Sequence, residues 1–367
     1  MKIVEVLFSL TPGGAERFVV DLSNEMSRTN DVILLTLKDD KINVEHRNFY
    51  KFDLSDRVKY INLGLPDGFS FKSYWKIFKV IKDLSPDIVH FNDKNLCKFC
   101  FLAIYLLSGK IKFYETIHND LHNGYDSGFN NFEFNTLGRW KKIKFIALSL
   151  KNYEDMTSYY PSSCFKCIVN GRAPIVPTNN FNQVKAELDQ YRKSNNTKIV
   201  LHVARFNPQK NQQLLIESFN ELAAKKNDVQ LIIIGSGFNT EEGEKLLSKT
   251  DGNVHYLGTR KNISDYMLNA DIFCLSSKFE GMPITLIEAS LAGIPCVSTP
   301  VCGSVDLIVD EKNGKLSKDF TKDSFVEALK YTLEHHAKLK YNAMIMRQNS
   351  PYTMCECAKK YLEYFVE

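Results

Sequence analysis

The chain has 367 residues, of which 44% are hydrophobic, 25% charged and 12% aromatic, and its formal net charge is +4. This length corresponds to about two domains at roughly 150 residues each. The charged and apolar fractions are those of globular proteins, which excludes a disordered, collagen-like or coiled-coil chain. The small positive charge does not indicate a nucleic-acid partner, and we expect none.

The N-terminal segment and the cysteines indicate the compartment. Met1–Phe8 is a short β-branched run interrupted by Glu5, which predicts a first strand rather than a signal peptide. Phe99–Leu107 is the richest apolar stretch and is about half as long as the roughly 18 residues of a membrane-spanning helix. Nine cysteines, an odd number, favour reduced thiols, so we expect a cytoplasmic protein.

Two cysteine pairs have the spacing of a metal half-site. They are Cys97 with Cys100 and Cys164 with Cys167, but 63 residues separate the pairs and no His stands at zinc-finger spacing. We therefore expect buried thiols, no metal and no cofactor.

Strand and helix patterns alternate along the chain, which predicts βαβ units and parallel sheets. The first series is strand 2–7, helix 15–27, strand 31–36, helix 74–83, strand 87–91, helix 96–107 and strands 113–116 and 145–147. The second series is a polar helix 187–196, strand 199–203, helix 212–224, strand 230–234, helix 241–248, strand 254–257, helix 263–268, strand 272–276, helix 283–292 and strand 296–298.

The turn-rich stretch 169–180 between the two series is the natural linker. The expected fold class is therefore α/β, with two Rossmann-like, doubly wound parallel-sheet domains facing a cleft. We place the N-terminal domain at 1–172, rejoined by a C-terminal helix at 352–367, and the C-terminal domain at 173–351. Ligands of such sheets bind at the carboxyl ends of the strands, so function is expected in the loops that follow them.

The loop after the first strand contains Gly13 and Gly14 and opens a helix. Two glycines let a backbone approach a ligand closely, and free amides at a helix start favour an anion. The loop lacks the three spaced glycines of the dinucleotide fingerprint, so an ordinary strand-to-helix turn stays open as an alternative.

A second loop, after the strand at 199–203, carries the cations Arg205 and Lys210 and then opens a helix. An Arg binds phosphate through two parallel hydrogen bonds and a Lys supplies a mobile point charge, so the pair suits a diphosphate. Two solvated cations would give the same pattern.

A third loop, Ser276–Met282, leads into a helix in which Pro283 is expected as the first residue. The amides of Ile284 and Thr285 would then be unpaired first-turn donors, which is a ready anion site.

Two glutamates flank this helix start. Glu280 lies in the loop, and Glu288 lies about five residues into the helix, roughly 8 Å along its axis. Carboxylates accept hydrogen bonds from hydroxyls, as acidic groups do with a ribose. Two of them beside a phosphate site fit a ligand with hydroxyls on both sides of its phosphates, which is a nucleotide sugar.

With these loops in place, the chain resembles glycosyltransferase family 4, the retaining, nucleotide-sugar-dependent enzymes of the GT-B fold. The most specific part is the pair Glu280 and Glu288, which matches the family's two-glutamate motif with seven residues between. The order and spacing of further short motifs extend the resemblance over nearly the whole sequence. These motifs are Gly13-Gly14-Ala15-Glu16, Pro86-Asp87-Ile88-Val89-His90, Asn170-Gly171, Val203-Ala204-Arg205, Gln209-Lys210, Ile234-Gly235-Ser236-Gly237 and Gly293-Ile294-Pro295.

The resemblance implies roles for the matching residues in catalysis. Arg205 and Lys210 match the family's diphosphate-binding cations, and Glu280 matches the carboxylate that holds a hydroxyl of the donor sugar. Glu288 matches the ribose ligand, and His118 matches a histidine that reaches the donor sugar in many relatives. A lone histidine is also often structural.

Further positions match the family's donor-binding backbone and base site. Pro283 departs from the commonest loop, where a Gly often stands, and a proline has no N–H to donate. Arg260 is placed to stack on the base, although a solvated Arg is equally compatible with the sequence. The remaining residues that the resemblance places against the donor are Gly13, Gly14, Gly235, Gly237, Gly281, Met282, Ile284 and Thr285.

The family also implies a mechanism and partners. Transfer proceeds with retention, cations and helix amides offset the charge of the departing diphosphate, and the acceptor proton passes to the phosphate. The C-terminal domain holds the donor, for which a UDP-sugar is expected from family frequency alone. The N-terminal domain holds the acceptor, a glycan or a lipid-linked saccharide of cell-surface polysaccharide synthesis.

A basic, aromatic segment, Phe71–Lys82, has the pattern of a membrane-surface helix, with Lys72, Lys76 and Lys79 on one face. A solvated outer face is the alternative. A second basic patch, 141–144, makes peripheral association with an anionic inner membrane face an expectation.

Two other functions stay open. A sugar-nucleotide epimerase or phosphorylase-like enzyme would share the fold but needs its own catalytic residues. A non-catalytic sugar-nucleotide-binding protein would not need the paired glutamates.

Overall fold

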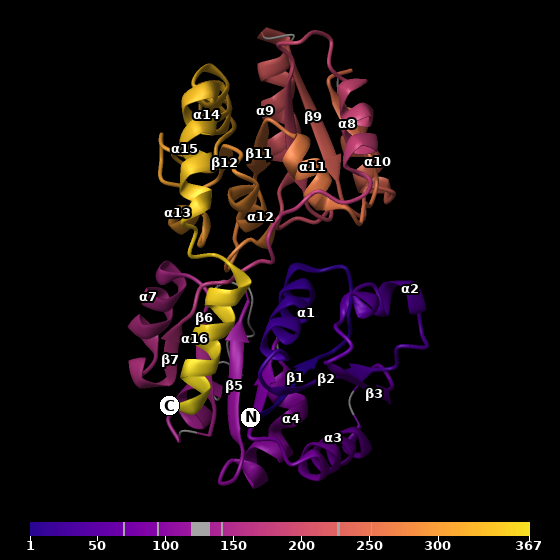
Figure 1. Cartoon of the computed structure of the whole chain (residues 1–367), viewed down its shortest axis with the longest axis vertical. Helices are drawn as coiled ribbons and strands as arrows, with labels where there is room; N and C mark the ends of the chain where they lie inside the picture. Colours follow the sequence, from indigo (N-terminus) through magenta and orange to yellow (C-terminus); the bar gives the residue numbers. More distant parts are fainter. Residues whose placement is uncertain (69, 94, 119–132, 141, 226–227, 251) are drawn as a thin grey trace. The chain divides into compact units, whose positions relative to one another are not determined.

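The computed structural model describes residues 1–68, 70–93, 95–118, 133–140, 142–225, 228–250 and 252–367. The chain divides into two compact units, residues 1–173 with 351–367 and residues 174–350. Each unit contains one parallel sheet with helices on both faces (Figure 1). The predicted α/β class with two doubly wound Rossmann-like sheets is confirmed.

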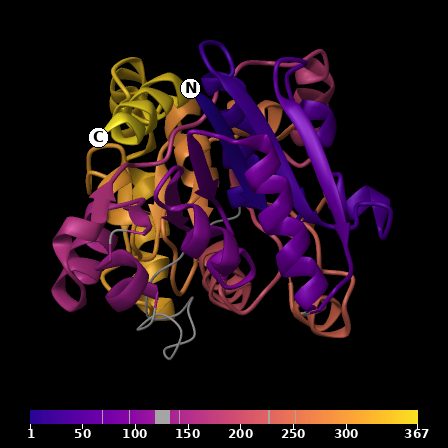
Figure 2. The same ribbon diagram turned by 90° about the horizontal axis from the view of Figure 1, so that it is seen from below.

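The sheet of the N-terminal unit has the strand order β3-β2-β1-β4-β5-β6-β7. The order reverses between β1 and β4, and in Figure 2 the indigo and violet strands of this sheet lie side by side. The strands are β1 (Lys2–Leu7), β2 (Asp31–Lys38), β3 (Lys59–Leu65), β4 (Ile88–Phe91), β5 (Lys112–Ile117), β6 (Lys144–Ala147) and β7 (Phe165–Cys167). The α-helices of this unit are α1 (Gly14–Met26), α2 (Val44–Arg47), α3 (Phe71–Leu84), α4 (Leu96–Leu107), α7 (Leu150–Tyr159) and α16 (Met354–Val366).

Helices α3 and α4 cover one face of this sheet because their apolar side chains recur at helical spacing. Ile77 and Ile81 of α3 are fully buried in a core that also contains Val89 and Phe91 of β4. Ser70 caps α3, since its hydroxyl accepts a hydrogen bond from the backbone N–H of the second helical residue, at 3.2 Å.

The C-terminal helix α16 covers the opposite face, packed beside α1 (Figure 1). Tyr361 of α16 is fully buried, and its hydroxyl lies 3.0 Å from Thr116 Oγ1 of β5. The same Oγ1 lies 2.7 Å from His90 Nε2, and His90 Nδ1 lies 2.8 Å from Glu5 Oε2. A chain of buried polar groups therefore joins three central strands to the last helix.

The second sheet has the strand order β10-β9-β8-β11-β12-β13, so its order reverses between β8 and β11. Its strands are β8 (Lys198–Val203), β9 (Val229–Ile234), β10 (Val254–Tyr256), β11 (Ile272–Leu275), β12 (Cys296–Ser298) and β13 (Gly314–Leu316). Its helices are α8 (Phe181–Asp189), α9 (Gln212–Lys225), α10 (Glu241–Leu247), α11 (Ile263–Asn269), α12 (Ile284–Ala292), α13 (Ser304–Leu307), α14 (Lys322–Glu334) and α15 (His336–Gln348).

Two local expectations were wrong. The polar helix expected at 187–196 is α8 at 181–189, because Ser194 and Thr197 form a turn in which Ser194 N–H donates to Thr197 Oγ1 at 2.9 Å. Pro283 is not the first helical residue of α12; it precedes the helix with extended backbone, φ −71° and ψ 112°.

Membrane-spanning helices, metal-ligating clusters and the state of the cysteines can be checked in the structure. Within the described residues, no helix is long and apolar enough to cross a membrane. In the same part of the chain, no group of three or more His, Cys, Asp or Glu side chains is arranged to hold a metal ion. The nine cysteines all lie in described positions and are free thiols, and Cys97 Sγ donates to Glu115 Oε2 at 2.7 Å.

Candidate functional site

In the C-terminal unit, the loops after β8 and β11 meet at the point where the strand order reverses, the usual ligand position of such sheets. Lys210 is fixed in the first loop, since its N–H donates to Asn207 Oδ1 at 2.9 Å and its carbonyl accepts from Ser276 Oγ at 2.8 Å. Lys278 N–H donates to Gln209 O at 2.8 Å. These hydrogen bonds join the two loops before any ligand is considered.

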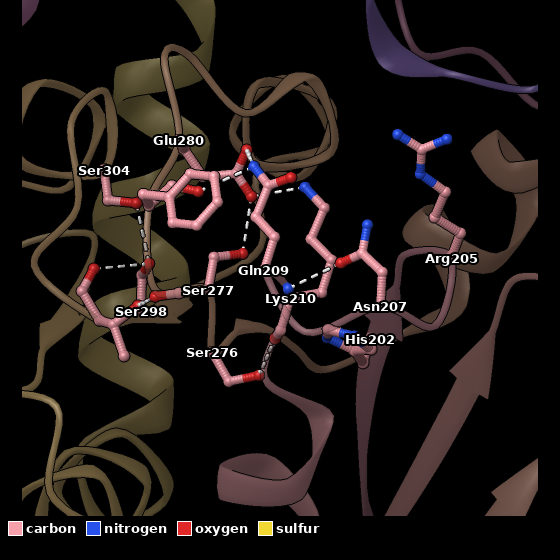
Figure 3. Close-up of polar contacts among 12 residues, drawn as sticks. His202, Arg205, Asn207, Gln209, Lys210, Ser276, Ser277, Glu280, Ser298 and Ser304 are labelled. Carbon is pink, nitrogen blue, oxygen red and sulfur yellow. Dashed lines mark hydrogen bonds and ion pairs between the residues drawn. The ribbon is translucent and has the colours of Figure 1, made fainter. Parts of the chain in front are cut away.

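The centre of the site is an ion pair between the two loops (Figure 3). Lys210 Nζ lies 2.5 Å from Glu280 Oε1, which also accepts from Ser277 Oγ at 2.6 Å. Gln209 Nε2 lies 3.5 Å from the other carboxylate oxygen and 2.9 Å from Phe279 O. Glu280 is only 6% exposed, so these donors replace the water that a buried carboxylate loses.

Arg205 lies in the same loop as Lys210 but does not join this network. Its side chain is exposed and points away from Glu280 in Figure 3. Among the described residues it has no hydrogen-bond or ion-pair partner. Its guanidinium is therefore available to an anion, whereas Lys210 already has a counter-charge.

His202, the next-to-last residue of β8, holds the Arg205 backbone through Gln212. His202 Nδ1 lies 3.0 Å from Cys274 O and Nε2 lies 3.5 Å from Gln212 Nε2, which donates to Arg205 O at 3.0 Å. A neutral imidazole with its proton on Nδ1 satisfies both contacts. Burial is the main cause that lowers the pKa of His202, to about 4, and the charge of Lys210 adds to it.

The two glycines after β9 allow the β8 loop to approach. A Cβ on Gly235 would lie 1.9 Å from Ala204 O, so no side chain fits there. Gly237 has φ +92°, which strains other residues, and a Cβ there would lie 3.2 Å from Phe206 O. This packing explains both glycines without a ligand.

Helix α12 begins at Ile284, directly after the loop that carries Glu280 and Gly281. The side chains of Met282 and Ile284 are buried, 4% and 8% exposed, so only their backbone could face a ligand. First-turn N–H groups have no intrahelical acceptor and carry the positive end of the helix dipole. Thr285 is partly exposed in the same turn.

Glu288 lies one turn further along α12 and is 7% exposed. Burial of a carboxylate costs free energy unless polar groups surround it. It is the second acidic group of the site after Glu280.

Arg260 follows β10 and is held by two residues of neighbouring helices. Its Nη2 lies 3.3 Å from Glu187 Oε1 of α8, and its Nε donates to the Tyr266 hydroxyl at 3.0 Å. Tyr266 donates in turn to Glu187 Oε2 at 2.5 Å. Arg260 Nη1 donates to Thr259 O at 3.4 Å. An Arg anchored through all three guanidinium nitrogens is less free to stack on a base than the sequence implied.

In the N-terminal unit, Gly13 precedes α1 with extended backbone and Gly14 is its first residue. Glu16 in the first turn accepts a hydrogen bond from the hydroxyl of Thr11. Its carboxylate complements the positive helix end, so this helix start already has an anionic group of its own.

His118 follows β5 in the same unit, with its ring 5.8 Å from that of Phe18. Its Nε2 is buried without a hydrogen-bond partner among the described residues. Burial, with the nearby His90, lowers the pKa of His118 to about 3, so the imidazole is neutral at physiological pH.

Comparison with known proteins decides the family. A sequence profile described as Glycosyltransferase Family 4 matches residues 12–169, and one described as Glycosyl transferases group 1 matches residues 183–348. The two matches fall one in each unit. The chain belongs to glycosyltransferase family 4. It is therefore a glycosyltransferase, of a family that retains the anomeric configuration of the transferred sugar.

Individual relatives agree with this assignment. This family 4 enzyme is 27% identical to an uncharacterized glycosyltransferase of Methanocaldococcus jannaschii, over 62% of this chain and 59% of that protein. It is 26% identical, over 91% and 90% of the two chains, to the N-acetylgalactosamine-N,N'-diacetylbacillosaminyl-diphospho-undecaprenol 4-alpha-N-acetylgalactosaminyltransferase of Campylobacter jejuni.

A solved structure shows the same fold. HepE of Anabaena, crystallised in complex with UDP-glucose, superimposes with a TM-score of 0.82 over 100% of this chain and 99% of that one, at 18% identity. The resemblance to the GT-B fold is thus confirmed at the level of architecture.

The glycosyltransferase has polar contacts that its sequence motifs did not indicate, although Gln209 itself belongs to one of those motifs. Ser277 and Gln209 share the hydrogen bonding of Glu280, and Glu187 and Tyr266 hold Arg260. The only available signal for Ser277 was a polar residue directly after a buried strand.

Proposed function

We propose that this glycosyltransferase moves a sugar from a UDP-sugar to a lipid-linked saccharide in cell-surface polysaccharide synthesis. The arrangement of Lys210, Glu280 and the start of α12 at the switch point of the second sheet carries the proposal. Two relatives support its finer parts: HepE is described in complex with UDP-glucose, and the Campylobacter enzyme is named for a diphospho-undecaprenol acceptor.

In this proposal the C-terminal unit is the donor side. Arg205, Lys210 and the backbone of the α12 start offset the negative charge that develops on the departing diphosphate. Groups that stabilise developing charge are most effective when the protein holds them in place before the reaction. Two hydrogen bonds to the backbone of Lys210 hold that residue in place. Glu280 binds a hydroxyl of the donor sugar, and Glu288 binds the ribose.

The remaining predicted residues take supporting positions in the same proposal. Gly281, Met282, Ile284 and Thr285 contribute backbone groups to phosphate and sugar, and the backbone at Gly235 and Gly237, with Arg260, borders the base. Gly13, Gly14 and His118 act from the N-terminal unit, which is the acceptor side. The neutral imidazole of His118 suits a hydrogen bond to a sugar hydroxyl better than proton transfer.

Peripheral membrane contact belongs to the same proposal. The outward face of α3 exposes 87% of Phe71 and 61% of Trp75 among exposed lysines at 72, 76, 79 and 82. Exposed aromatic rings favour a membrane surface over a merely solvated face, because burying them in lipid removes apolar area from water. Of the second basic patch, Lys141 lies outside the described residues.

The test is a panel of UDP-, GDP- and ADP-sugars in a thermal-unfolding assay of the full chain. A bound donor stabilises only the folded state, so a UDP-sugar should raise the Tm and the other nucleotides should not. Sugar release from the stabilising donor to a membrane extract then tests transfer. If none of the nucleotide sugars raised the Tm, the proposal of a donor site would be contradicted.

A further inference from the structure

Gln209 belongs to the motif Gln209-Lys210 but has no role in the proposed function. It lies in the loop after β8, and its carbonyl accepts a hydrogen bond from the N–H of Lys278 in the loop after β11, at 2.8 Å. Its side chain is half-buried. The backbone of Gln209 is therefore held at the place where the two loops of the site meet.

The two oxygens of the Glu280 carboxylate have different surroundings. Oε1 accepts hydrogen bonds from Lys210 Nζ at 2.5 Å and from Ser277 Oγ at 2.6 Å (Figure 3). Ser277 is itself held, because its carbonyl accepts from Thr299 Oγ1 at 2.6 Å. Among the described residues, Oε2 has only Gln209 Nε2, at 3.5 Å, beyond the usual range of about 2.7–3.2 Å. Oε2 can therefore accept a further hydrogen bond, whereas Oε1 already has two.

The amide of Gln209 also has a donor to offer. A carboxamide carries two N–H groups. One of them donates to Phe279 O at 2.9 Å, and within the described part of the chain the other has only the long contact with Glu280 Oε2. A hydrogen-bond donor and a hydrogen-bond acceptor thus lie side by side, each with capacity for one more partner.

We propose that Gln209 Nε2 and Glu280 Oε2 together bind one hydroxyl group of the transferred sugar. A hydroxyl donates its proton to the carboxylate and accepts from the amide at the same time. Its oxygen can lie about 2.8 Å from both atoms when these are 3.5 Å apart. The inference rests on the proposed function, since it adds a second residue to the sugar contact of Glu280.

The chemistry of the pair disfavours other groups at this point. A diphosphate oxygen carries no proton for the carboxylate, and its negative charge is repelled by that of Glu280. An ammonium group donates to the carboxylate but cannot accept from the amide of Gln209. Gln209 therefore makes the pair specific for a neutral hydroxyl, which the carboxylate alone is not.

The experiment is a calorimetric titration of the full chain with UDP and with four UDP-sugars. These carry glucose, galactose, N-acetylglucosamine or N-acetylgalactosamine, and the measured quantity is the Kd of each UDP-sugar divided by the Kd of UDP. Gln209→Met has a side chain of similar length without an N–H. For the UDP-sugar that the unmodified chain binds most tightly, it should raise this ratio at least fivefold, about 1 kcal/mol. The Kd of UDP should change by less than about twofold, because the amide does not contact the diphosphate.

Gln213→Met is the matched control. Gln213 Nε2 donates to Glu217 Oε1 at 2.8 Å on α9, so this variant loses the same kind of amide beside a carboxylate, outside the site. Its ratio should equal that of the unmodified chain. Thermal melts of all variants show that each is folded.

A double variant tests whether the two residues bind the same hydroxyl. Glu280→Gln should raise the ratio as well, since a neutral amide oxygen accepts a weaker hydrogen bond than a carboxylate. Residues that share one partner have non-additive effects. The double variant Gln209→Met with Glu280→Gln should therefore raise the ratio by about the same factor as the larger single change.

Four outcomes would overturn the inference. They are an unchanged ratio in Gln209→Met, an equal loss of affinity for UDP and the UDP-sugar in that variant, additive effects in the double variant, and binding of UDP without binding of any UDP-sugar. The second of these would mean that Gln209 only supports the loop of Lys210. Absence of UDP binding by the unmodified chain would reject the proposed function instead.

Discussion

Lys210 Nζ and Glu280 Oε1 are 2.5 Å apart, and each is the counter-charge of the other in the ligand-free enzyme. The family resemblance gives these residues different ligands, a diphosphate and a sugar hydroxyl. The nucleotide sugar would therefore enter a site in which the Glu280 carboxylate already accepts hydrogen bonds from both Lys210 and Ser277. The site is therefore ordered by its own contacts rather than by the donor.

Lys210→Met should remove both the pairing and the contact with the diphosphate. Glu280 would remain buried without its counter-ion, so we expect the free energy of unfolding to fall by about 2 kcal/mol. Transfer should fall at least a hundredfold, about 2.7 kcal/mol of transition-state stabilisation. Denaturant titration and a transfer assay measure the two effects.

The control for this variant is Lys225→Met, which breaks an exposed pair with Glu221 on α9. Exposed pairs contribute little, so stability and transfer should be unchanged. Normal transfer in Lys210→Met would show that this lysine does not act on the diphosphate.

Glu288→Gln tests the ribose assignment. Loss of a charge-assisted hydrogen bond of about 1.5–3 kcal/mol should weaken UDP binding at least tenfold. Binding of inorganic pyrophosphate, which has no ribose, should be unchanged. Calorimetric titration with UDP and with pyrophosphate measures the two affinities. The control is Glu217→Gln on α9, since Glu217 accepts a hydrogen bond from Gln213 and lies outside the proposed site.

An equal loss of affinity for UDP and pyrophosphate in Glu288→Gln would contradict a ribose contact. It would indicate instead that the substitution disturbs the start of α12.

Phe71→Ala tests membrane contact through α3. Removing a ring that is 87% exposed should release the enzyme from vesicles of phosphatidylglycerol in a flotation assay, because the buried apolar area is lost. Phe52→Ala is the matched control, since Phe52 is 91% exposed outside α3. Equal flotation of both variants, or equal flotation on uncharged phosphatidylcholine, would exclude α3 as a membrane surface.

Much of the fold could be predicted because its strands and helices have clear periodicity. Helix α4 was expected at 96–107 and is found there, since its apolar residues form an unbroken run from Phe99 to Leu107 and polar residues precede and follow the helix. The strand β3 was not predicted, because Lys59–Leu65 mixes Lys, Tyr, Asn and Gly and only two of its residues are buried. Its place beside β2 comes from pairing with a distant strand, which no local pattern records.

The sequence predicted which loops form the candidate site, but not which side chains of those loops contact one another. Gly and charged residues after each strand mark the ligand edge of a parallel sheet. That Lys210 and Glu280 meet, 70 residues apart in the chain, depends on β8 and β11 being neighbours at the switch point. The ion pair between Glu187 and Arg260 likewise depends on the packing of α8 against α11.

His202 should make stability depend on pH. Burial lowers its pKa to about 4 in the folded enzyme, whereas an unfolded histidine titrates near 6.5. The unfolded state therefore binds the proton first, and the stabilisation present above about pH 6.5 is lost as the pH falls toward 4. The free energy of unfolding should fall by up to about 1.4 kcal/mol per pH unit from this residue.

Denaturant titrations at pH 7.5, 6.0 and 5.0 measure this slope. His202→Asn should be less stable at pH 7.5, because the contacts with Cys274 and Gln212 change, but its stability should vary less with pH. His46→Asn, at an exposed position of α2, should retain the full slope. An identical slope in His202→Asn would mean that the proton uptake occurs at other groups. The next residue to substitute would then be His118, because burial lowers its pKa as well.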